Sequence, residues 1–274
     1  SARSFLPPAL RPLAALALAA CASAPAPGGS IAASVAAMAD SGDFVTRLGA
    51  DTLVVERFVR SPRRVEADVV LRVPQTTRTR YVLALDAAGM LERMDAEQLA
   101  LRPGAPVRRE SIVRAGDSLR VEVTDAQGTR TRSVAAPAGV LPFIDMIHWP
   151  YEVALVRMRA AGRDSVVQPL LTGARITDFR LARIGGDSVT VTHPFRGTMR
   201  ALTDASGRLL GLDAGATTRK LVVVREPAGS LGDIAAAWAA RDAAGRPAGA
   251  LSGRAETREV VAGATIVVDY GTPS

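Results

Sequence analysis

The residue with the most specific chemistry in this 274-residue chain is its single cysteine, Cys21. It ends the tetrapeptide Leu18-Ala19-Ala20-Cys21, which closes an apolar run over residues 13–21. Lipoprotein maturation needs such a run for secretion, small residues before the cleaved bond, and a thiol that accepts diacylglycerol. The tetrapeptide therefore predicts a lipobox, with a signal peptide over residues 1–20 and lipidation of Cys21. The alternatives are an ordinary cleaved secretory signal and an alanine-rich start with a chance cysteine.

The length of the apolar run and the residues after it indicate where in the cell the protein is located. Its uninterrupted length of about nine to eleven residues is short of the roughly twenty that span a bilayer. Residues 22–23, Ala-Ser, lack the aspartate that retains many lipoproteins at the inner membrane of enteric bacteria. We expect a lipid-anchored protein of the bacterial cell envelope, at the outer membrane in a host with two membranes. Because the chain begins with Ser1 instead of methionine, we also expect that the sequence is a fragment at its N-terminus.

Other reactive side chains are not arranged for catalysis. His148 and His193 stand in no metal-binding spacing, and Ser118 and Ser188 follow Gly-Asp without the second glycine of a nucleophile elbow. Four aspartates recur in turn-like segments, where hydrogen bonds to the local backbone explain them: Asp51, Asp117, Asp164 and Asp187. The sequence predicts no catalytic residue, no metal site and no cofactor, and leaves an envelope hydrolase as a minor alternative.

Aromatic and apolar residues gather in one segment, residues 141–151, which includes Phe143, Met146, Trp149 and Tyr151. Helical spacing continues to residue 161, so we expect a helix over 141–161. One interpretation is a helix that fills the core of a curved sheet. The other is an apolar lip, formed by those four residues, on a concave sheet that takes a lipid or another hydrophobic ligand.

Composition and charge exclude some partners. With 48% apolar and 22% charged residues the chain has an ordinary globular composition, and its net charge of +7 falls to +5 if the signal peptide is removed. The arginines are dispersed and form no basic stripe with aromatic readers, so we expect no nucleic-acid partner. The expected partners are the membrane, through the anchor, and a hydrophobic small molecule or an envelope protein.

The remaining pattern is that of a β protein. Apolar and polar residues alternate at period two over residues 44–48, 52–59, 65–73 and 80–85. Aspartate and glycine then punctuate the chain as in hairpin turns, for example at Asp86–Gly89 and Asp204–Gly207. A helix is expected at residues 230–244 behind Ser230, and a hairpin at 256–261 and 264–270.

The C-terminal stretch, residues 251–274 with Val-Asp-Tyr-Gly-Thr-Pro at 268–273, resembles the opening of a bacterial domain-of-unknown-function family found on secreted proteins and lipoproteins. The segments 51–58, 79–86 and 134–139 resemble the N-terminal extension of such proteins. The Gly/Arg-rich turn and Trp-Arg segment that follow in the family are absent, so the resemblance implies that this chain stops within a second β domain. It implies no activity.

Together these features predict a mainly β fold: a large curved antiparallel sheet or half-barrel with one or two packing helices, followed by a truncated β unit. The expected divisions are a signal peptide (1–20), a lipidated tether with a short helix (21–40), a β-rich domain (41–228), a helix and linker (229–250), and the second β unit (251–274). The leading hypothesis is a non-enzymatic envelope lipoprotein that binds a hydrophobic ligand or an envelope partner. A structural spacer for the missing C-terminal domain is the alternative.

Overall fold

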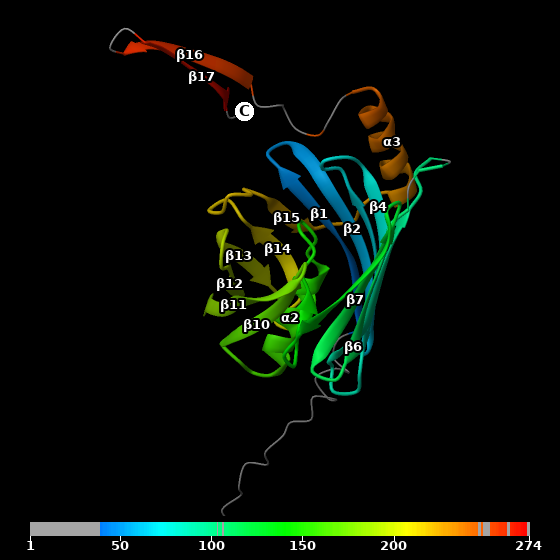
Figure 1. The fold of residues 1–274 in the computed structure, drawn as a ribbon. Helices are drawn as coiled ribbons and strands as arrows, with labels where there is room; N and C mark the ends of the chain where they lie inside the picture. The colour runs from blue at the N-terminus through cyan, green and yellow to red at the C-terminus, as the bar shows by residue number, and fades with distance from the viewer. Residues whose placement is uncertain are drawn as a thin grey trace, which may run out of the picture.

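The computed structural model describes residues 39–102, 104–105, 107–245, 248, 253–261 and 264–272. Within these residues the chain forms one 15-stranded sheet, two helices and a separate two-stranded sheet (Figure 1). The prediction of a mainly β protein with a large curved antiparallel sheet and packing helices is confirmed. Cys21, the lipobox and the tether lie outside the described residues.

The first eight strands follow one another as an antiparallel meander. Buried residues alternate with more exposed ones most clearly in the fourth strand, where Tyr81, Leu83 and Leu85 are the buried set. The strands are β1 (Asp40–Leu48), β2 (Asp51–Ser61), β3 (Arg64–Leu71), β4 (Thr77–Leu85), β5 (Leu91–Leu99), β6 (Arg109–Ala115), β7 (Ser118–Asp125) and β8 (Gly128–Ala135).

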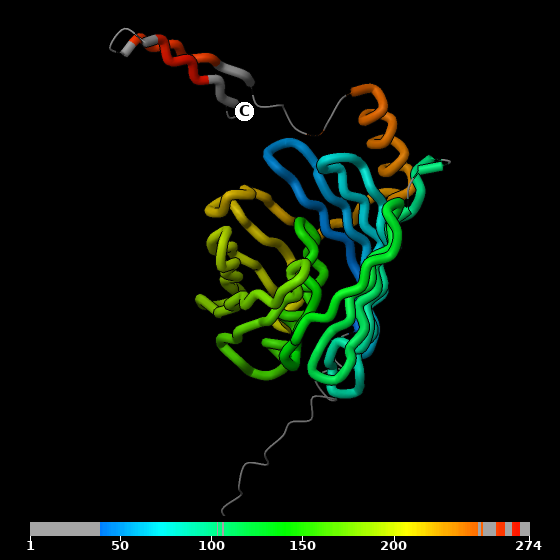
Figure 2. The backbone as a smooth tube through the Cα atoms, viewed as in Figure 1, coloured from blue at the N-terminus to red at the C-terminus, as the bar shows by residue number. Residues whose placement is uncertain are grey.

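The other seven strands extend the same sheet beyond β1. Figure 2 shows the chain leaving β8, passing through a helix into the second half and returning to β1. All neighbours are antiparallel except the two strands at the far edge, β9 and β10, which are parallel. The strands are β9 (Leu141–Pro142), β10 (Ser165–Thr172), β11 (Arg175–Gly185), β12 (Ser188–His193), β13 (Gly197–Thr203), β14 (Leu209–Asp213) and β15 (Val222–Arg225).

The two halves meet where β15 pairs with β1, in the register Phe44 opposite Arg225. The helix α2 (Trp149–Ala160) lies between the halves (Figure 1). Nine of its twelve residues are buried, which is typical of a helix enclosed on all sides. The interpretation of this segment as a helix that fills the core of a curved sheet is confirmed.

The expected start of this helix at residue 141 is wrong. Leu141–Pro142 form β9, and the helix begins eight residues later than predicted, at Trp149. Pro150 occupies the first turn, where a missing backbone N–H costs nothing. Proline is compatible with both an edge strand and the first turn of a helix. Pro142 and Pro150 therefore do not show in the sequence where the helix begins.

The second helix, α3 (Leu231–Ala243), covers the outer face of the sheet over β2 and β3. As predicted, Ser230 caps it, with its Oγ accepting a hydrogen bond from the Asp233 N–H at 3.3 Å. Leu231, Ala235 and Trp238 pack against the outward-facing Val55 and Val70. Neither helix in the described part of the chain is long and apolar enough to cross a membrane.

The predicted C-terminal hairpin is confirmed as β16 (Gly253–Val261) paired with β17 (Ala264–Thr272). The predicted hairpin turns are also present: Gly89 and Gly207 have φ angles of 76° and 86°, which favour glycine. The short helix expected up to residue 40 lies mainly outside the described residues, and Asp40 itself begins β1.

Candidate binding cavity

A cavity of about 330 Å³ lies on the concave side of the first half, between β4–β6 and the chain after β9. We call it the lateral cavity. Its apolar lining combines buried residues, such as Met94 and Ile112, with partly buried ones. The apolar lining residues are Tyr81, Met94, Ala96, Ile112, Pro142, Phe143, Ile144 and Leu171.

The polar lining is more exposed than the apolar lining, so the cavity has an apolar floor and a polar rim. Inward-facing positions near the ends of β4–β6 and on β8 supply most of it. The polar lining residues are Thr79, Gln98, Arg108, Glu110, Arg132 and Asp145. A pocket of this size, with an apolar floor and a few convergent polar groups, is typical of small-molecule sites.

Two arginines on the rim differ in their partners. The Arg108 guanidinium pairs with Glu110 at 2.8 Å. Arg132 donates to the carbonyl oxygen of Gly173 at 3.0 Å, which ties β8 to the β10–β11 turn. Among the described residues, no carboxylate forms an ion pair with Arg132.

Asp145 positions the opposite wall. Its carboxylate pairs with Arg196 (2.5 Å between Oδ1 and Nη1) and with Arg219. The Arg196 guanidinium also lies 5.8 Å from the ring centre of Phe143. These contacts hold the non-helical segment between β9 and α2 against the cavity.

The four residues of the expected lip do not line one ligand-sized cavity. Phe143, Met146 and Tyr151 border a void of about 30 Å³, enough for roughly one water molecule. Of the four, Phe143 alone also borders the lateral cavity.

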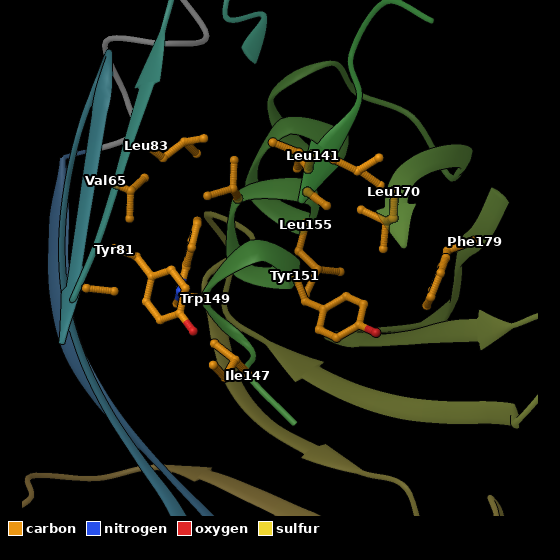
Figure 3. Close-up of a cluster of buried hydrophobic side chains, with 14 of the residues drawn as sticks. Val65, Tyr81, Leu83, Leu141, Ile147, Trp149, Tyr151, Leu155, Leu170 and Phe179 are labelled. Carbon is orange, nitrogen blue, oxygen red and sulfur yellow. The ribbon is translucent and has the colours of Figure 1, made fainter. Parts of the chain in front are cut away.

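Trp149 corrects the lip interpretation, because it is a core residue with an exposed fraction of 0%. Its ring lies 6.1 Å from that of Tyr81, while Tyr151 lies toward Phe179 (Figure 3). Tyr81 therefore packs on the core tryptophan and also borders the cavity. Burial raises the pKa of the Tyr81 hydroxyl well above its usual range, so it is a neutral group at physiological pH.

Two buried glutamates hold α2 in the sheet. Glu56 of β2 accepts hydrogen bonds from the N–H groups of His148 (2.8 Å) and Trp149 (3.1 Å) at the helix start. A carboxylate there satisfies unpaired donors and complements the helix dipole. The His148 Nδ1 lies 2.9 Å from the same carboxylate, so this histidine has a structural contact.

Glu152, in the first turn of α2, joins strands from both halves. Its Oε1 lies 3.0 Å from Arg60 of β2 and 3.2 Å from Arg225 of β15. Burial raises the pKa of Glu152, although both arginines and the Leu209 N–H oppose that shift. Arg225 also pairs with Asp40 at 2.5 Å. This network ties the helix to β1, β2 and β15, and it has a structural role.

The second histidine, His193, lies among aromatic rings, 4.6 Å from Phe179. Burial lowers its pKa, with the nearby Arg196 adding to the effect. In the part of the chain that the structure describes, no three His, Cys, Asp or Glu side chains are grouped to hold a metal ion. Ser118 donates to the Ala115 carbonyl in a hairpin turn, as its sequence context indicates.

A wider hollow of about 560 Å³ lies over the ends of β1, β2 and β15. Its charged groups are already paired: Arg57 with Asp43, Arg225 with Asp40, and Glu226 with Arg47. In the lateral cavity, Arg132 has no ion-pair partner among the described residues, and the floor includes the buried Met94 and Ile112. This cavity is therefore the better candidate for ligand binding.

Sequence reasoning missed most of this cavity, namely Met94, Ala96 and Ile112 on the floor and Arg108 and Arg132 on the rim. One signal was present. Polar residues occupy inward-facing positions such as Gln98 and Glu110, where the alternating pattern calls for apolar ones. Interpreting that signal requires the strand register, which the sequence does not contain.

The fold and cavity define a mainly β protein with a helix enclosed by a curved sheet and a lateral, amphiphilic pocket. No protein-family model and no curated protein matches the sequence. One solved structure that the comparison matched to this chain is that of a beta-barrel-like protein of domain of unknown function DUF1849 from Brucella abortus. It is 12% identical, and the match covers 68% of this chain and 94% of that one with a TM-score of 0.43.

Proposed function

We propose that this protein is a non-enzymatic lipoprotein of the bacterial cell envelope that binds a hydrophobic small molecule in the lateral cavity. The observation that carries the proposal is the cavity of about 330 Å³ beside a core of closely packed, buried apolar side chains. A structural spacer has no need of such a space, because close packing is the more stable arrangement. An apolar ligand gains about 25 cal/mol for each Å² of apolar surface that it buries there.

The binding test uses the full chain carrying Cys21→Ser, which cannot be lipidated and needs no detergent. The probe is N-phenyl-1-naphthylamine, an uncharged dye that fluoresces in apolar surroundings. Ala96→Phe places a ring on the cavity floor and is expected to abolish dye binding. Thr124→Phe, on the outer face of β7, is the matched control and is expected to leave binding unchanged.

Saturable dye binding that Ala96→Phe removes and Thr124→Phe preserves supports the proposal. Absence of saturable binding by the parent protein, or equal binding by both phenylalanine variants, contradicts it. Circular dichroism of each variant establishes that the fold is retained.

The anchor is tested separately. Cys21 is the single thiol of the chain, so Cys21→Ser is expected to abolish palmitate labelling in bacteria and to release the protein from membranes. Sucrose-gradient fractionation of the parent protein tests the expected outer-membrane location. A Cys21→Ser protein that still sediments with membranes contradicts the lipobox.

A further inference from the structure

We infer that the lateral cavity binds a single-chain amphiphile with an anionic head, placing the head at Arg132 and Arg108 and the acyl chain along the apolar floor. This inference rests on the proposed function and adds the class of ligand. It follows from the unpaired charge of Arg132 on the rim, the burial of the apolar floor and the size of the cavity.

The rim has one arginine, Arg132, whose guanidinium forms no ion pair with a carboxylate of the described residues. Glu110 is paired with Arg108, and Asp145 with two arginines outside the cavity. Arg132 keeps guanidinium donors beyond the one used by the Gly173 carbonyl. The four charged lining residues, Arg108, Arg132, Glu110 and Asp145, have a net charge of zero. Arg196 and Arg219, which pair with Asp145 from outside the cavity, raise the total to +2, so the anionic head is placed at the side of the rim where Arg132 lies.

The floor matches an alkyl chain. Met94 and Ile112 are buried on strands β5 and β6, and Leu171 lies opposite them on β10. None of these side chains offers a strong hydrogen-bonding group to a ligand. An uncharged alkyl chain therefore lies on the buried floor, and the charged head stays at the exposed arginines, because burying a charge without a partner is costly.

The volume limits the ligand to one chain. At roughly 30 Å³ for each water-sized group, the 330 Å³ cavity holds on the order of eleven such groups. A methylene is about as large as a water molecule, so the cavity suits one medium-length chain. Two long chains of a diacyl lipid exceed this volume.

The test measures displacement of N-phenyl-1-naphthylamine by three twelve-carbon compounds below their micelle concentrations: dodecanoate, dodecanol and dodecyltrimethylammonium. Dodecanoate is expected to bind at least about tenfold more tightly than the cation, the ratio expected for one charge-assisted hydrogen bond. Dodecyl phosphate is the further arm that separates a carboxylate preference from a phosphate preference. Either preference supports an anionic head.

Substitutions of Arg132 test whether the preference for the anionic compound comes from the rim of the cavity. Arg132→Gln is expected to remove most of the tenfold ratio, whereas Arg132→Lys keeps most of it because the charge remains. Arg120→Gln, on the outer face of β7, is the control and is expected to keep the full ratio.

Equal binding of anion and cation, or a ratio that Arg132→Gln leaves intact, overturns the inference while dye binding still supports the proposed function. Failure of the parent protein to bind the dye overturns both. The two failures are therefore distinguishable.

Discussion

At the scale of single residues, one side chain decides between the two interpretations of the aromatic segment. Trp149 has an exposed fraction of 0% and packs between α2 and the first half of the sheet. Within the part of the chain that the structure describes, its Nε1 has no hydrogen-bond partner, so the side chain is held by apolar packing, while the backbone N–H donates to Glu56. Its contribution belongs to stability and not to ligand contact.

Trp149→Ala is therefore expected to lower the free energy of unfolding by about 3–5 kcal/mol, the usual cost of deleting a buried large aromatic side chain. Urea denaturation followed by far-ultraviolet circular dichroism measures this loss. The control is Phe195→Ala, whose ring is 68% exposed, with an expected change within about 0.5 kcal/mol. A loss below about 1 kcal/mol for Trp149→Ala would show that the residue is not a core anchor.

A second residue, Asp204, gives a pH dependence. Burial acts to raise the pKa of its carboxyl, but hydrogen bonds from Ser206 and Arg208 outweigh burial and hold the pKa well below its usual range. A depressed pKa stabilises the fold above the unfolded value of about 4 and loses that contribution as the pH falls through the folded value.

As the pH is lowered from about 6 to about 2.5, we expect the melting temperature of Asp204→Asn to fall less than that of the parent protein. The amide keeps an acceptor for the turn but cannot titrate. Thermal melts at several pH values give the two slopes. Identical slopes would contradict a depressed pKa at this position.

At the scale of elements, the turn between β13 and β14 packs directly on α2. A Cβ placed on Gly207 would lie 2.7 Å from the Arg159 Cβ and 3.0 Å from the Leu155 carbonyl oxygen. Its φ of 86° also disfavours any side chain. The turn can therefore approach α2 this closely because position 207 has no side chain.

Gly207→Ala is expected to cost about 1–2 kcal/mol for the backbone conformation and a further 1–3 kcal/mol for overpacking. Gly128→Ala, in the β7–β8 turn, is the matched control, since its φ is 107° and no atom lies within 4 Å of the added Cβ. Denaturant midpoints of the two variants separate the terms. Equal losses in both variants would show that the close approach to α2 carries no cost.

Local patterns predicted the elements better than they predicted the site. Period-two alternation located the strands between residues 44 and 85, and Ser230 located α3, because these signals depend on near neighbours in the chain. The parallel pairing of β9 with β10 and the start of α2 depend on contacts with distant residues such as Glu56. The cavity was missed for the same reason, since β5, β6 and β8 form it only once their register is known.

At the scale of the whole molecule, the main sheet and the β16–β17 hairpin are separate sheets, and α3 belongs to the main sheet. Leu231 and Trp238 cover Val55 and Val70, which are buried on the outer face. Four apolar side chains of the hairpin are exposed: Val260, Ile266, Val267 and Val268. We therefore expect the stability of the main sheet to depend on α3 and not on the hairpin.

A protein shortened to end at Gly245 is expected to keep the thermal midpoint of the full chain. A protein that ends at Gly229 lacks α3, so the apolar face of the sheet under Leu231 and Trp238 becomes exposed to water. Its free energy of unfolding is expected to be about 3 kcal/mol or more below that of the full chain. Calorimetry of the three proteins measures both effects. A lowered midpoint for the protein ending at Gly245 would place the hairpin within the cooperative unit.

Because β1 pairs with β15, the main sheet cannot be completed until nearly all of its strands have been synthesised. Phe44 and Arg225, which face each other in that pair, are 181 residues apart in the chain. At about 5–20 residues per second, synthesis separates the two strands by roughly 10–40 s. During that interval β1 through β8 can form from sequential hairpins, yet β1 presents an unpaired edge and Glu152 lacks Arg225. A strand of four residues, made last in the sheet, is what closes the edge and completes the buried charge network.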